Sequence, residues 1–211
     1  MEQRSRSVRH VAPRRATPSA RLSARRCAAA LLMAAGTAGY SAAAQAQAVP
    51  DRASAVEVRK QYLLDLDTLQ SKFLALAQAF PAEKYSWRPA PGVRSVGEVF
   101  MHVASEYYIY APMSFGAARS PVIAKGQPAL EAFEKMSTKE DVLKHLKEGF
   151  AYAQSAVSGV DPAALVGQQK LFGGTYTILE TSLGMAADMH EHLGQLIAYA
   201  RVNGIKPPWS K

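Results

Sequence analysis

The sequence predicts an all-α fold, a four-helix bundle with long connections between its helices. Three observations favour this class. From residue 52 to residue 203 apolar residues recur mostly every three or four positions, which is the spacing of one helix face. Three of the segments begin with a capping box, a Ser or Thr followed three residues later by Glu. The connections between them are rich in Pro and Gly, and runs of β-forming residues are sparse.

Residues 1–46 resemble an export signal rather than part of the bundle. Residues 1–44 carry eight Arg and one acidic residue, and an apolar run at 27–40 precedes small residues with several A-x-A cleavage sites. We expect cleavage in the region 44–50 and a periplasmic or secreted protein. The apolar run is short for a bilayer span, so no stable membrane anchor is expected after processing. Arg25 and Arg26 leave the twin-arginine route open beside the general one.

The net charge of +8 belongs to that leader. The rest of the chain holds 17 basic and 16 acidic residues and has no run of Lys or Arg that would follow a phosphate backbone. Nucleic acid is therefore not an expected partner. Cys27 is the only cysteine and lies in the leader, so the mature domain, residues 51–211, is expected to use neither a disulfide nor a cysteine nucleophile.

The first two helices have clear boundaries in the sequence. The first covers residues 52–80 and ends before Pro81, and in the proline-rich loop that follows Tyr85 and Trp87 can cover the end of the core. The second begins at the capping box Ser95–Glu98 and is expected to end or kink at Pro112.

The third helix follows a long loop, begins at a predicted box at Ser137–Glu140 and runs to about residue 158. His145 is expected on its solvated face, among charged residues. The stretch LFGGTY at 171–176 predicts a short hairpin or an extended strap. The fourth helix begins at a third box, Thr177–Glu180, and has Gly204 at its C′ position.

Residues 188–195, DMHEHLGQ, concentrate metal-binding side chains on the fourth helix. Asp188 and His192 are four residues apart and share a helix face, whereas His190 is rotated by roughly 200° and cannot converge with them. A carboxylate and an imidazole at this spacing can supply two ligands of a divalent-metal site. Two alternatives stay open: Asp188 orients His192, or both lie on a solvent-exposed face.

A second pair at the same spacing, His102 and Glu106, lies on the second helix. A lone His on an apolar helix is usually a satisfied core residue, but the pair on another helix favours His102 as a ligand. Glu106 has three candidate roles: fourth ligand, hydrogen-bond acceptor for His102, or general base.

Three stretches resemble the DinB-like family of bacterial four-helix bundles: WRPAPGVRSVGEVFMHV at 87–103, HEHLGQLIAYARVNG at 190–204 and IKPPWS at 205–210. The resemblance implies a metal, often nickel or zinc, held by one His of the second helix and two of the fourth. His102 and His192 match two of these positions, but Asp188 stands at the third. A set of His102, Asp188 and His192 can still bind Zn, Ni, Mn or Fe, or the site is degenerate.

Three functions therefore stay open. The first is a metal-dependent enzyme, hydrolase- or transferase-like, that acts on a small molecule, with Glu106 as a candidate general base. The second is a non-catalytic metal- or small-molecule-binding stress protein. The third is a structural bundle that forms a homodimer and keeps a degenerate metal site. The thiol-dependent activity of some relatives fits poorly, because an exported protein meets an oxidising compartment.

Overall fold

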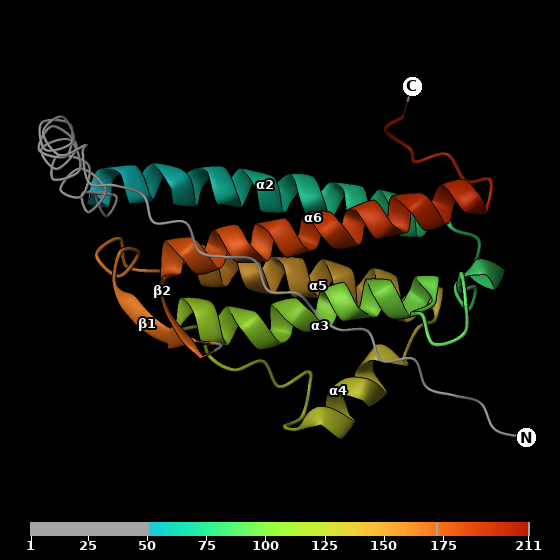
Figure 1. The fold of residues 1–211 in the computed structure, drawn as a ribbon, viewed down its shortest axis with the longest axis horizontal. Coiled ribbons are helices and arrows are strands. Elements are labelled where there is room, and N and C mark those ends of the chain that lie inside the picture. The colour runs from blue at the N-terminus through green and yellow to red at the C-terminus, as the bar shows by residue number, and fades with distance from the viewer. Residues whose placement is uncertain (1–50, 172, 211) are drawn as a thin grey trace, which may run out of the picture. The chain divides into compact units, whose positions relative to one another are not determined.

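The computed structural model describes residues 51–171 and 173–210, so the predicted leader and its cleavage region lie outside the described residues. The described chain forms four long helices, α2 (Arg52–Ala79), α3 (Val96–Phe115), α5 (Lys139–Ser158) and α6 (Ile178–Val202) (Figure 1). This confirms the predicted helix bundle. None of the helices that the structure describes is both long and apolar enough to cross a membrane.

The four long helices pack in a ring, in which α5 and α6 each lie beside both α2 and α3. α2 and α6 run in one direction, and α3 and α5 run in the other (Figure 1). Because α3 and α5 are parallel, the chain between them must return along the length of the bundle. A long connection makes this return, and its short helix α4 (Gln127–Glu134) packs against α3.

Local sequence determines where most of the helices begin and end. Ser95 and Glu98 form a complete capping box at the start of α3, and Thr177 and Glu180 form another at the start of α6, which confirms both predictions. Gly204 follows α6 with a φ of 72°. Glycine adopts this left-handed conformation without a side-chain clash, as its predicted C′ position requires.

Two predicted boundaries need correction. The box predicted at the start of α5 is wrong by one residue: Thr138 is the N-cap, and its side chain accepts a hydrogen bond from the Asp141 amide. The Asp141 carboxylate accepts a hydrogen bond from the Thr138 hydroxyl at 2.6 Å. It does not accept one from the Thr138 backbone amide, which a complete capping box would require. Helix α3 does not end at Pro112 but continues to Phe115, where Gly116 with a φ of 68° ends it.

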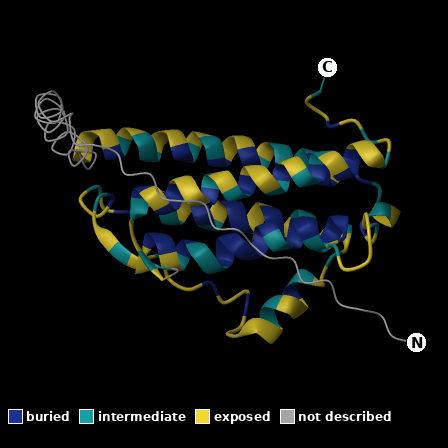
Figure 2. Ribbon diagram, in the orientation of Figure 1, coloured by how far each residue is buried: buried dark blue, intermediate teal, exposed yellow. Residues whose placement is uncertain are grey.

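An aromatic core lies between the helices, and buried residues line their inner faces (Figure 2). Phe73 of α2 contacts Phe100 of α3 and Phe150 of α5, with ring centroids 6.5 and 5.8 Å apart. Tyr85 covers one end of this core, as predicted, because its ring stacks on Phe100. The remaining contacts are mostly aliphatic, so the bundle is stabilised chiefly by burial of apolar surface.

His145 is buried, and its predicted place on the solvated face of α5 is wrong. Phe133 of α4 and Tyr108 of α3 cover it, with ring centroids 4.8 and 6.2 Å from the imidazole. The charged neighbours of His145 in the sequence indicate an exposed position. The contact with Phe133 could not be predicted from them, because it depends on how the long connection places α4. Burial lowers the pKa of His145 and so favours the neutral ring.

The connection before α6 is an antiparallel hairpin, which confirms the hairpin alternative. Strand β1 (Gln168–Leu171) pairs with β2 (Gly174–Thr177), and Gln169 lies opposite Tyr176. The Gln169 side-chain amide donates to the Ser114 carbonyl at 3.0 Å. The hairpin is therefore attached to the last turn of α3, and it leads directly into the first turn of α6.

Candidate metal centre

Helices α3 and α6 bring two imidazoles and a carboxylate together inside the bundle. His102 and Glu106 are one turn apart on α3, and His192 faces them from α6. One ligand atom from each of the three lies within 4.8 Å of the other two. The sequence spacing of four residues on α3 and the antiparallel packing of α6 produce this convergence.

Glu106 lies between the two imidazoles. His102 Nε2 is 3.3 Å from Glu106 Oε1, and His192 Nε2 is 3.7 Å from Glu106 Oε2. The two imidazole rings are nearly perpendicular, with centroids 4.9 Å apart. Glu106 is buried and both His side chains are largely shielded from solvent, so charge in this cluster is poorly screened by water.

A carboxylate on α4 orients His102. His102 Nδ1 lies 2.7 Å from Glu134 Oε1, so the ring donates its Nδ1 proton there and its Nε2 lone pair points toward Glu106. Arg94 contacts the other oxygen of Glu134 at 3.3 Å. Burial alone would raise the pKa of Glu134, but the hydrogen bond from His102 and the charge of Arg94 outweigh it, and the pKa is lowered. Glu134 is therefore an ionised acceptor.

His192 is oriented in the same way by a polar chain on α6. Its Nδ1 faces Gln195 Oε1 at 3.4 Å, and the Gln195 amide donates to the Tyr199 hydroxyl at 2.9 Å. Tyr199 donates in turn to the Arg94 carbonyl at 3.3 Å. This chain places the His192 proton on Nδ1 and leaves Nε2 free to bind a cation. Burial, and then electrostatic repulsion from the neighbouring His102, lower the pKa of His192 and so favour its neutral ring.

The two imidazoles and the Glu106 carboxylate therefore face one another with lone pairs, and no other described residue places a hydrogen-bond donor between them. Glu106 Oε2 is buried and has no hydrogen-bond partner among the described residues. Burial, and then the negative charge of Asp188, raise the pKa of Glu106 to about 9. A buried carboxylate facing two Nε2 lone pairs is stable only with a proton or a cation between them. The residues present thus fit a divalent metal ion.

Asp188, a predicted ligand, lies at the rim of this cluster. Its Oδ1 is 3.8 Å from His192 Nε2, and its side chain is 43% exposed. The structure thus brings His102, Asp188 and His192 into one region, while Glu106 takes the inner position. His190 lies outside the cluster, as predicted: its ring contacts Asp65 of α2 at 3.0 Å and is 48% exposed.

Comparison with known proteins places this chain in a family. A sequence model of the DinB superfamily matches residues 65–196, a range that includes His102, Glu106 and His192. The chain belongs to the DinB superfamily. The crystal structure of a DinB-like protein from Bacillus subtilis is similar in fold, with a TM-score of 0.55 at 17% identity, covering 69% of this chain and 93% of that chain. No match was found among curated proteins.

One residue of this DinB-superfamily site, Glu134, was missed by the sequence analysis. It lies in the connection that was expected to be mainly loop, on a helix of only eight residues. Its place beside His102 depends on how α4 docks on α3, which periodicity does not reveal. The available signal was weak: an acidic residue on a short amphipathic segment, together with a second-helix His in need of an acceptor.

Proposed function

We propose that this DinB-superfamily protein is a divalent-metal-dependent enzyme, hydrolase- or transferase-like, that acts on a small molecule between α3 and α6. One observation carries the proposal. Two imidazoles, each with its Nδ1 proton directed at an acceptor, present their Nε2 lone pairs to a buried carboxylate that lacks a hydrogen-bond donor. A buried carboxylate in this position needs a proton or a cation, and one cation between the three groups would engage both Nε2 lone pairs and the carboxylate at once.

His102, Glu106 and His192 are the residues that would hold the metal. A set of two imidazoles and one carboxylate suits Zn, Ni, Mn or Fe and leaves coordination positions for other groups. When bound, the ion supplies a Lewis acid that polarises an oxygen of the substrate. We thus assign Glu106 to the metal, which is one of its three candidate roles, and Asp188 to proton transfer in place of its predicted role as a ligand.

Asp188 is suited to proton transfer by its position. It is the more exposed of the two carboxylates and lies 3.8 Å from His192, so it borders both the metal ligands and solvent. In a hydrolysis, Asp188 accepts a proton from water as the water oxygen bonds to the electrophilic atom of the substrate. The bond to the leaving group then breaks, and Asp188 returns the proton to that group.

Activity of the metal-loaded protein tests this proposal. Chelator-treated protein is reloaded with Zn, Ni, Mn or Fe and assayed against a panel of small esters and amides, beginning with 4-nitrophenyl acetate. We expect turnover with at least one ion and none without metal. Asp188→Asn should lower kcat by about 100-fold or more while bound metal is retained, as expected for loss of a general base.

Glu191→Gln is the matched control, because Glu191 is an exposed carboxylate on the same helix. It should leave kcat unchanged. Turnover that is equal with and without metal, or that Asp188→Asn leaves intact, would contradict the assignment.

A further inference from the structure

Side chains on the facing sides of α3 and α6 form the candidate metal centre and, next to it, a cavity. His102, Glu106, Tyr110 and Ser114 follow one another every four residues along α3. α6 runs in the opposite direction (Figure 1). His192 of α6 therefore faces His102, with ring centroids 4.9 Å apart, whereas Thr181 lines the cavity together with Ser114.

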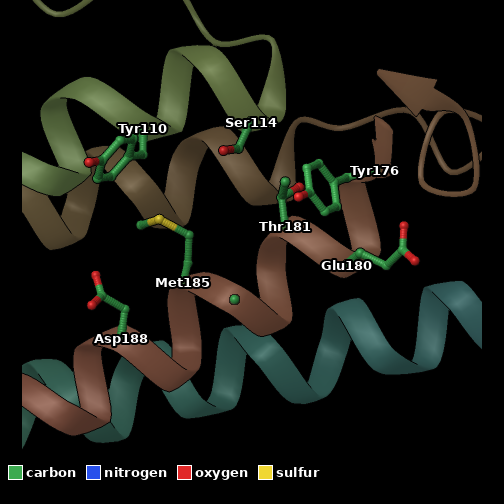
Figure 3. A pocket seen from close by; sticks show the side chains of 8 residues that line it. Tyr110, Ser114, Tyr176, Glu180, Thr181, Met185 and Asp188 are labelled. Carbon is green, nitrogen blue, oxygen red and sulfur yellow. The ribbon is translucent and has the colours of Figure 1, made fainter. Parts of the chain in front are cut away.

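The cavity has a volume of about 250 Å³. Figure 3 shows its walls: Tyr110 and Ser114 project from α3, and Tyr176 of the hairpin stands at the far end. Thr181, Met185 and Asp188 form the α6 wall. A cavity of roughly 150 Å³ accommodates benzene, so this one has room for an aromatic ring with a short substituent. Asp188 belongs to both sites, so a molecule in the cavity has one end beside the metal ligands.

The charged groups of the cavity wall are both acidic. Glu180 and Asp188 line it, and none of its lining residues is Lys, Arg or His. Glu180 already accepts from the Thr177 amide at 2.7 Å, which holds its carboxylate at the helix start. Asp188 is half-exposed and faces His192 at 3.8 Å. In the metal-free protein an anionic ligand would therefore meet the Asp188 carboxylate at one end of the cavity, and no lining residue supplies a cation to balance it.

We infer that the cavity binds a small, mainly apolar molecule that is neutral or positively charged, and that in the metal-free protein it binds carboxylates and phosphates weakly. As a statement about substrate, this rests on the proposed metal-dependent function. As a statement about binding, it rests on the cavity alone. The apolar body fits beside Met185 and the Tyr110 ring, and the Ser114 hydroxyl is available to a polar substituent.

Three probes that share one ring separate size from charge: benzyl alcohol, benzylamine and benzoate. Their affinities are measured by two-dimensional amide NMR, with metal-free and with metal-loaded protein. With metal-free protein we expect benzyl alcohol and benzylamine to shift amides around residues 181–188, and benzoate to bind at least tenfold more weakly because of the Asp188 carboxylate. Benzoate binding to metal-free protein as tightly as the other two would overturn the inference.

Gly184 offers a variant that fills the cavity without disturbing the helix. It lines the cavity, and a Cβ built on it meets no atom within 4 Å. Gly184→Leu should therefore fold normally and weaken benzyl alcohol binding at least tenfold. Gly194→Leu is the matched control, since Gly194 is equally exposed on α6, equally unobstructed and outside the cavity. Binding that survives Gly184→Leu, or that Gly194→Leu abolishes equally, would overturn the inference.

The two proposals fail in different ways. If the probes bind with this selectivity but the protein holds no metal under any loading condition, the cavity inference stands and the proposed function falls. If the protein shows metal-dependent turnover and none of the three probes binds, the proposed function stands and the cavity inference falls.

Discussion

At the scale of single residues, Glu106 controls the charge balance of the site. It is buried between two imidazoles, and Asp188 adds a second negative charge nearby. Without a cation, its carboxylate is stable mainly in the protonated form, and the raised pKa of about 9 expresses this. A divalent ion replaces that proton, so metal binding is expected to release a proton and to strengthen as pH rises.

The first prediction concerns the stability of the metal-free protein. Between pH 5 and pH 9 folded Glu106 keeps a proton that the unfolded chain has released, because its pKa is about 9 instead of the ordinary 4.5. The free energy of unfolding should therefore fall as pH rises, by up to about 1.4 kcal/mol per pH unit from this group. Glu106→Gln cannot titrate and should remove this contribution.

Urea denaturation of both proteins at pH 5 and pH 8, with chelator present, measures the effect. The difference in free energy of unfolding between Glu106→Gln and the wild type should grow in favour of the variant from pH 5 to pH 8. An equal pH dependence in the two proteins would show that Glu106 is ionised in the folded state without metal.

At the scale of the element, the short helix α4 contributes both to the core and to the candidate metal centre. This short helix covers His145 with Phe133 and places Glu134 beside His102. The same segment therefore joins the core to the metal centre. Its docking holds the His102 ring in one tautomer and one orientation, which are the properties that a metal ligand needs.

The second prediction concerns this contact. Glu134→Gln removes the ionised acceptor at His102 Nδ1 and should lower metal affinity by about 10- to 100-fold, with little change in helix content. Competition with a chromophoric chelator measures the affinity, and circular dichroism measures the fold. Glu131→Gln is the control, because Glu131 is an exposed carboxylate one turn earlier on α4. Equal affinities in the two variants would exclude an orienting role for Glu134.

What the sequence could predict at this scale was mainly local. The capping boxes at Ser95 and Thr177 and the helix faces depend on residues three and four positions apart, so they can be recognised in the sequence. The pairing of His102 with His192 came from a family resemblance. The burial of His145 and the position of Glu134 depend on how a long connection folds back over α3 and α5. No periodic pattern encodes that path, so these two could not be predicted.

At the scale of the whole molecule, the sequence divides into a basic leader and a nearly neutral domain. Most of the net positive charge lies in residues 1–44, whereas the bundle begins at Arg52. We expect the leader to direct export and to be removed, so that the domain works outside the cytoplasm.

The third prediction concerns this processing. N-terminal sequencing of protein from the native host should find a mature start between Gln45 and Pro50, because the A-x-A sites lie just before these positions. Substituting the alanines at 42, 44, 46 and 48 with bulky residues should block cleavage. An intact leader on a cytosolic protein would overturn the export prediction.

The proposed enzymatic function depends on a metal held by His102, Glu106 and His192. Elemental analysis of protein purified without a metal-affinity tag tests this directly. We predict about one divalent transition metal per chain in the wild type. His192→Ala should lose it while circular dichroism stays unchanged, because the core residues Met189 and Leu193 are untouched. A wild type without metal, or metal that survives His192→Ala, would contradict the metal centre.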